Sequence, residues 1–229
     1  AVGLADNGKK ILLISTDPAS NLQDVFNQPL NGHGSAIADV PGLTVVNLDP
    51  EQAAAEYRER VIAPFKGKLP VSVIQNMEEQ LSGSCTVEIA AFNEFSDFIT
   101  DIQKQDEYDH IIFDTAPTGH TLRMLQLPSA WSTFISESTH GASCLGQLSG
   151  LEERKEIYKK AVATLSNAQT TQLVLVSRPE AAPLNEAARS SHELLLLGIR
   201  NQLLIINGVL QQLDKSDAIS NQLHERDRK

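Results

Sequence analysis

A short apolar run that ends in an aspartate places the strongest constraint on this chain. Residues 111–113 are apolar, Asp114 follows them, and residues 115–121 are rich in Thr, Pro and Gly. A second apolar run, residues 11–15, leads in the same way to Asp17. An acid at the carboxyl end of a buried strand is where nucleotide-hydrolysing α/β proteins hold magnesium beside a phosphate. The pattern therefore predicts two loops that meet around one phosphate and its metal.

Apolar runs of strand length alternate with helical patterns along the chain. We expect strands at 11–15, 43–48, 110–114, 172–177 and 202–207. All five are nearly continuously apolar, which is typical of strands that are covered on both faces. Alternation of strands and helices predicts an α/β fold, with a parallel sheet flanked by helices and joined by right-handed crossovers.

The longest interval between predicted strands covers approximately residues 50–108. Its apolar residues recur with helical spacing at about 51–62 and 86–103. We expect this interval to form a helical region inserted into one domain that spans residues 1–229.

The composition limits the classes of partner and compartment. The net charge of −10, from 29 acidic and 19 basic residues, argues against nucleic acid, because phosphate backbones require a basic face. Apolar runs stay below the roughly 18 residues that span a bilayer, and the sequence shows no signal-peptide pattern. We therefore expect a cytoplasmic protein without nucleic acid as a partner.

Two strand-end residues allow a structural as well as a functional interpretation. Asp17 precedes Pro18, which keeps the chain out of the helical conformation there, so its carboxylate could hold a magnesium-bound water. It could equally cap the following helix. Asn207, followed by Gly208, could read the edge of a base with its donor and acceptor, or simply form a turn.

Two cysteines and one histidine form a further group of candidates. Cys85 and Cys144 each lie beside small residues, and they are too far apart for a C-x-x-C metal motif. They are either small buried apolar residues or thiols for a soft, thiophilic ion. His120 follows Asp114 closely and would join such a ligand site to the nucleotide site.

Four strings give the chain a specific resemblance to a known family. They are STDPASN (15–21), LSGSCTVEIAAF (81–92), DTAPTGHTLRMLQLP (114–128) and GASCLG (141–146). Together they resemble the first half of the arsenical pump-driving ATPases, the subunits that energise arsenite and antimonite efflux. The resemblance implies a P-loop NTPase fold of the deviant Walker A (SIMIBI) type.

The resemblance also implies roles for individual residues. Asp17 would be the switch I acid that positions the hydrolytic water and helps to hold Mg²⁺, and Asn21 would lie near the phosphates. Asp114 would be the Walker B acid, and Asn207 would contact adenine. The As(III)/Sb(III) site, an allosteric site, would use Cys85, Cys144 and His120.

One motif of such an enzyme does not occur in the sequence. No G-x-x-x-x-G-K-[ST] string is present, so we expect the phosphate-binding loop and its strand to lie upstream of Ala1. The domain would then be partial and inactive alone. The resemblance implies ATP as the substrate and, as partners, a second nucleotide-binding half in the same chain or a homodimer, and an integral membrane efflux subunit. It would place the protein peripherally at the inner face of the plasma membrane.

Three other interpretations remain open from the sequence. A targeting ATPase for tail-anchored membrane proteins shares two of the strings but would need an apolar groove, often rich in methionine, and this chain has two Met. A partitioning or scaffold protein would use the nucleotide only for dimerisation and would leave the two thiols without a purpose. A purely structural α/β domain would not explain two strand-end acids.

Overall fold

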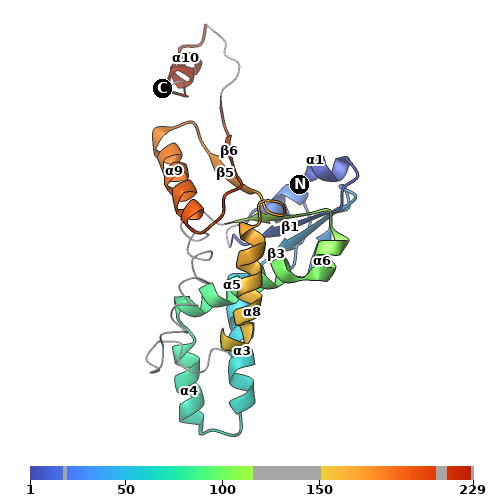
Figure 1. The fold of residues 1–229 in the computed structure, drawn as a ribbon, viewed down its shortest axis with the longest axis vertical. Coiled ribbons are helices and arrows are strands. Elements are labelled where there is room, and N and C mark those ends of the chain that lie inside the picture. The colour runs from blue at the N-terminus through green and yellow to red at the C-terminus, as the bar shows by residue number, and fades with distance from the viewer. Residues whose placement is uncertain (18–19, 116–150, 210–215, 228–229) are drawn as a thin grey trace. The chain divides into compact units, whose positions relative to one another are not determined.

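The computed structural model describes residues 1–17, 20–115, 151–209 and 216–227 (Figure 1). The chain divides into two compact units, Ala1–Ala161 and Val162–Lys229. Within each unit, parallel strands are flanked by helices, as the sequence predicts. The assignment of the whole chain to one partial domain with an insertion stays a prediction.

The first unit is built on a four-stranded sheet. Its strands are β1 (Ile11–Ser15), β2 (Ser35–Ala36), β3 (Leu43–Asn47) and β4 (His110–Asp114), in the order β2-β3-β1-β4. β1 runs parallel to β3 and to β4, and the two-residue β2 pairs antiparallel with β3. The three predicted strands in this unit are confirmed, although β3 ends one residue earlier than expected.

The central strand β1 has every residue buried, which explains its continuous apolar pattern. Successive side chains point to opposite faces of a sheet. Ile11 and Leu13 accordingly join a core on one face, and Leu12 and Ile14 join a core on the other. Because both of its faces are covered, β1 lies inside the sheet, and so does its carboxyl end at Ser15.

Helices in this unit surround the sheet and fill the long interval between β3 and β4. They are α1 (Val2–Asp6), α2 (Leu22–Phe26), α3 (Pro50–Ile62), the 3-10 turn η1 (Ala63–Phe65), α4 (Val71–Gln80), α5 (Ser84–Thr100), α6 (Ile102–Glu107) and α8 (Leu151–Ser166), which extends across the unit boundary. α3 begins where Asp49 accepts hydrogen bonds from the backbone N–H groups of Glu51 and Gln52, at 2.9 and 3.1 Å. Asp in this position satisfies N–H groups that the helix itself leaves unpaired.

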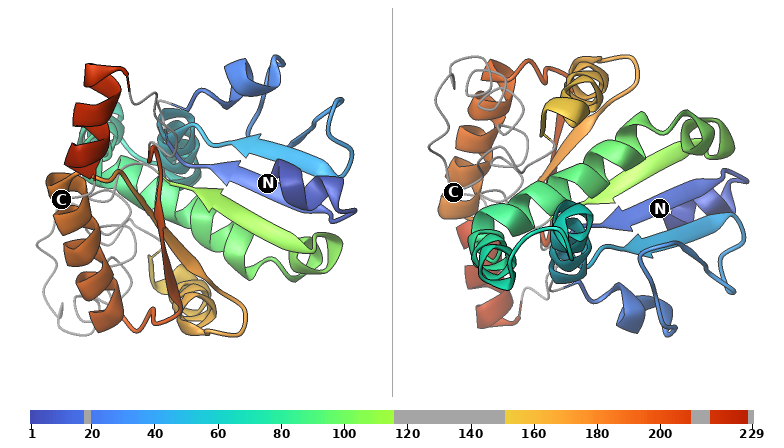
Figure 2. Two further views of the ribbon diagram at one scale, coloured as in Figure 1. Left: turned by 90° about the horizontal axis from the view of Figure 1, so that it is seen from above. Right: turned by 90° about the horizontal axis from the view of Figure 1, so that it is seen from below.

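The helical stretch expected at 86–103 is two helices. Asp101 has an extended ψ of 104°, and this ends α5. Its carboxylate then accepts a hydrogen bond from the N–H of Gln103 at 3.0 Å and so caps α6. α5 lies along one face of the sheet, where Phe98 packs with Leu12 and Ile14 (Figure 2).

The second unit contains a parallel pair of strands joined by a helix. β5 (Leu173–Ser177) and β6 (Gln202–Ile206) are connected by α9 (Ala181–Leu196), and α10 (Ala218–Asp227) follows. Both predicted strands are confirmed, each one residue shorter than expected. A crossover helix between parallel strands is the connection that such a pair requires.

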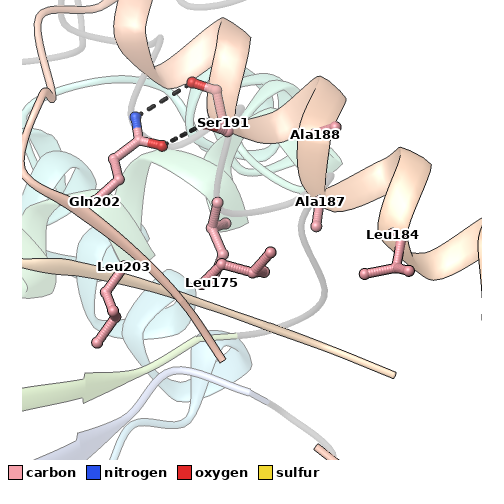
Figure 3. A pocket seen from close by; sticks show the side chains of 8 residues that line it. Leu175, Leu184, Ala187, Ala188, Ser191, Gln202 and Leu203 are labelled. Carbon is pink, nitrogen blue, oxygen red and sulfur yellow. Dashed lines mark hydrogen bonds between the residues drawn. The ribbon is translucent and has the colours of Figure 1, made fainter. Parts of the chain in front are cut away.

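A pocket lies between α9 and these two strands (Figure 3). Its apolar lining includes Leu175, Leu184 and Leu203. Its polar residues are paired with each other: the Ser191 hydroxyl donates to Gln202 Oε1 at 2.6 Å, and Gln202 Nε2 donates to the Ser191 carbonyl at 3.2 Å. No residue that the sequence analysis singled out lines this pocket.

Candidate functional site

The two strand-end acids lie at the same edge of the four-stranded sheet. β1 and β4 are parallel neighbours, and their register places Ser15 directly opposite Asp114. The N–H of Thr16 donates to the Asp114 carbonyl at 2.9 Å, which holds the start of the loop after β1 against the end of β4. Asp17 is the next residue. The sheet therefore brings Asp17 and Asp114 together, although 96 residues separate them in the sequence.

The surroundings of Asp114 change the ionisation of its carboxylate. Partial loss of hydration, and secondarily the negative charge of Asp17, raise the pKa of Asp114. Asp114 keeps contact with solvent and Asp17 is half-buried, so a ligand could reach both. Two carboxylates that repel each other at an accessible strand edge offer the hard oxygen ligands that Mg²⁺ prefers. The donor set therefore fits this ion.

Two further polar residues at this edge were missed in the sequence. Ser15 is fully buried, and its hydroxyl accepts a long hydrogen bond, 3.4 Å, from the N–H of Asp17. Asn47 ends β3 opposite Ser15, and its side-chain oxygen is buried without a partner among the described residues. The signal was available, since each is the polar last residue of an apolar strand.

Asn21 lies at the start of α2, four residues after Asp17. Its carbonyl accepts the first backbone hydrogen bonds of that helix, from Asp24 and Val25 at 3.0 and 3.1 Å. Its side chain makes no capping hydrogen bond and is exposed to solvent. Its contact with phosphate stays a prediction.

Asn207 follows β6 in the second unit. Its side-chain oxygen accepts a hydrogen bond from the N–H of Gly208 at 2.9 Å. Gly208 has φ +76°, a conformation that glycine adopts without strain. The turn-forming interpretation of this pair is thus realised, and contact with adenine stays a prediction.

The three candidate residues for a soft, thiophilic ion lie only partly within the described structure. Cys85 is the second residue of α5, and its side chain is not among those described. Cys144 and His120 lie outside the described residues. Within the described part of the chain, no cluster of three or more His, Cys, Asp or Glu side chains could hold a metal ion.

Comparison with known proteins now identifies the family. The model of a family described as "Anion-transporting ATPase" matches residues 1–229. The chain belongs to this family. The resemblance noted in the sequence strings is thereby confirmed.

Three curated relatives illustrate the similarity, two of them arsenical pump-driving ATPases and the third less similar. The chain is 50% identical over 228 residues to an arsenical pump-driving ATPase of Escherichia coli, a match that covers 99% of the chain and 39% of that relative. A second arsenical pump-driving ATPase, from Acidiphilium multivorum, is 49% identical over the same shares. ATPase GET3 of Kluyveromyces lactis is 29% identical over 240 residues, which cover 95% of the chain and 68% of that protein.

The chain thus spans about two fifths of the length of these two arsenical pump-driving ATPases. In the described part of the chain, none of the helices has the length and apolar character needed to cross a membrane.

Proposed function

We propose that this chain is a nucleotide-binding half of an ATPase that drives arsenite and antimonite efflux. One structural observation supports the ATPase part of this proposal: Asp17 and Asp114 lie at the same accessible edge of the sheet, where partial loss of hydration, and secondarily the charge of Asp17, raise the pKa of Asp114. The identity of 50% to an arsenical pump-driving ATPase supports the choice of substrate system over the 29% identity to GET3.

In this proposal Asp17 and Asp114 hold the magnesium ion of Mg·ATP. The bound ion supplies charge neutralisation at the phosphates. Asp17 orients the attacking water through its carboxylate, and Asn21 contacts the phosphates. Asn207 contacts the adenine ring with the amide nitrogen, because its oxygen already accepts the N–H of Gly208.

Residues 1–229 contain no G-x-x-x-x-G-K-[ST] string. In this proposal the 229 residues belong to a P-loop domain of the deviant Walker A type, with the helical region at about 50–108 as its insertion.

The metalloid is an allosteric ligand in this proposal. Trivalent arsenic and antimony are soft and bind thiolates well, so Cys85 and Cys144, with His120 nearby, form the part of the site that this chain supplies. A further thiol would come from a second nucleotide-binding half. Closure of the two halves around the metalloid then favours the hydrolytic state. An integral membrane efflux subunit would hold the ATPase at the inner face of the plasma membrane.

Substitution of the two cysteines in the intact protein tests this function. We expect arsenite to stimulate ATP hydrolysis by the wild type, and we expect Cys85→Ser or Cys144→Ser to lower the apparent affinity for arsenite by at least tenfold, because an alcohol is a poor ligand for a soft ion. Ser82→Ala, an exposed change close to Cys85, is the matched control and should respond as the wild type does. Stimulation at full affinity in both cysteine variants would contradict the thiol site.

The targeting function of the GET3 type is the second candidate. The same ATP hydrolysis assay distinguishes this function from the efflux function, because a hydrophobic peptide, and not arsenite, should then raise ATP turnover. A scaffold protein would show no response of turnover to either ligand.

A further inference from the structure

A row of aromatic rings connects the helix that carries Cys85 with the strand that carries Asp114. Phe95, on α5, contacts Phe113, on β4, with ring centroids 4.7 Å apart and planes inclined at 63°. Phe113 immediately precedes Asp114. The edge of one ring therefore meets the face of another next to a candidate magnesium ligand.

The row continues away from the sheet. Phe95 lies 6.2 Å from Phe92 on the same helix, and Phe92 lies 5.1 Å from Tyr158 on α8, both measured between ring centroids. Phe92, Phe95 and Tyr158 are at most 5% exposed. Aromatic pairs of this kind contribute about 0.5–1.5 kcal/mol beyond their buried area, and they have a preferred geometry. The energy of each contact therefore depends on how its own two rings are placed, and only the contact between Phe95 and Phe113 reaches the strand that carries Asp114.

α5 is continuous between Cys85 and Phe95. It is an uninterrupted helix of 17 residues, with Cys85 at its second position. Ten residues separate Cys85 from Phe95, which is about 15 Å of helix at 1.5 Å per residue. On the α8 side, the Tyr158 hydroxyl donates to Asn93 Oδ1 at 2.5 Å and Arg154 pairs with Asp97. A displacement at Cys85 thus reaches Phe95 through a continuous backbone.

We propose that Phe95 is a positioning residue that couples occupancy of the Cys85 thiol to the placement of Asp114, through its contact with Phe113. This inference rests on the proposed function. It requires that the metalloid shifts α5, that α5 shifts the Phe95 ring, and that the ring biases the end of β4. For binding, coupling of this kind is reciprocal: nucleotide must change the affinity for the metalloid by the factor by which the metalloid changes the affinity for nucleotide.

The test compares three forms of the intact protein: wild type, Phe95→Leu and Phe92→Leu. Leucine keeps an apolar side chain but removes the edge-to-face contact. Phe92→Leu is the matched control, because it removes an equally buried ring from the same helix and leaves Phe95 and Phe113 in place. Two quantities are measured: ATP turnover with and without antimonite, and the Kd for antimonite with and without a non-hydrolysable ATP analogue.

For Phe95→Leu we expect unchanged turnover without antimonite and a Kd for antimonite alone within twofold of the wild type. The stimulation of turnover should fall below about twofold, and the effect of the analogue on the Kd should disappear, since allosteric factors are commonly about 5–150-fold. Phe92→Leu should keep both effects. If Phe95 had only a structural role, both variants would have an altered melting temperature, and the analogue would still change the Kd for antimonite as it does in the wild type.

The outcomes are distinct. If Phe95→Leu keeps the coupling factor, or if Phe92→Leu loses it equally, the role of Phe95 is overturned while the proposed function stands. If the wild type responds to antimonite in neither assay, the proposed function itself fails.

Discussion

Asp17 and Asp114 could be recognised as candidates in the sequence because each follows an apolar run of strand length, and the two runs together predicted that the acids meet. The pairing that brings them together, with β4 beside β1 and Ser15 opposite Asp114, is visible only in the structure. The turn made by Asn207 and Gly208 illustrates a second case. There the sequence left a turn and a base contact open, and the short-range hydrogen bond shows that the turn forms.

The like charges of the two acids predict a stability effect. Because the pKa of Asp114 is raised in the folded state, this group favours folding only at low pH, and that contribution is lost as the pH rises through the raised value. In the absence of divalent cations, Asp114→Asn should therefore raise the melting temperature at neutral pH, by about 2 °C. The gain should vanish at a pH where an ordinary aspartate is protonated.

Scanning calorimetry across this pH range measures the effect. Asp39→Asn, an exposed turn residue in the same unit, is the control and should not change the melting temperature at any pH. A melting temperature that Asp114→Asn lowers at neutral pH would contradict a raised pKa of Asp114 in the folded state.

At the scale of elements, the periodicity of apolar residues predicted every strand of five residues. Strands buried on both faces, such as β1, have unbroken apolar runs, so both their existence and their type are visible. The break between α5 and α6 was missed, because Asp101 caps a helix through a side-chain hydrogen bond that no apolar periodicity reveals. The two-residue β2 was too short to leave any pattern.

The contact between α5 and α8 gives a prediction about stability and pH. Tyr158→Phe removes a buried hydroxyl and leaves Asn93 Oδ1 without its donor, which should lower the free energy of unfolding by about 1–2 kcal/mol. Burial raises the pKa of Tyr158 to about 12, against 10.0 for an exposed tyrosine. The wild type should accordingly lose stability between pH 10 and 12, as the unfolded tyrosine ionises first.

Urea denaturation at pH 8 and pH 11 tests both statements. Tyr108→Phe is the control, since its hydroxyl does not belong to this contact. Tyr158→Phe should lose less stability than the wild type between the two pH values. Equal losses in both proteins would mean that Tyr158 is not protected from ionisation.

At the scale of the molecule, parallel pairing concentrates function at strand ends. In the first unit, where β1, β3 and β4 run parallel, Asp114 ends β4 and Asp17 lies in the loop after β1. In the second unit, Asn207 follows the parallel pair β5 and β6. Parallel sheets place ligands at this carboxyl edge. The sequence predicted the class of fold and the strand-end acids, while the role of the interior of α5, with its aromatic contact to β4, emerged only from the structure.

The central claim is that Asp17 and Asp114 serve one Mg·ATP site, and single-turnover ATP hydrolysis by the intact protein tests it most directly. Asp17→Asn should keep nucleotide binding nearly intact and lower the rate by orders of magnitude, because water positioning is lost. Residues that act as a unit are not additive, so the double variant with Asp114→Asn should be no slower than the slower single variant. A normal rate in Asp17→Asn, or losses that multiply in the double variant, would contradict a shared site.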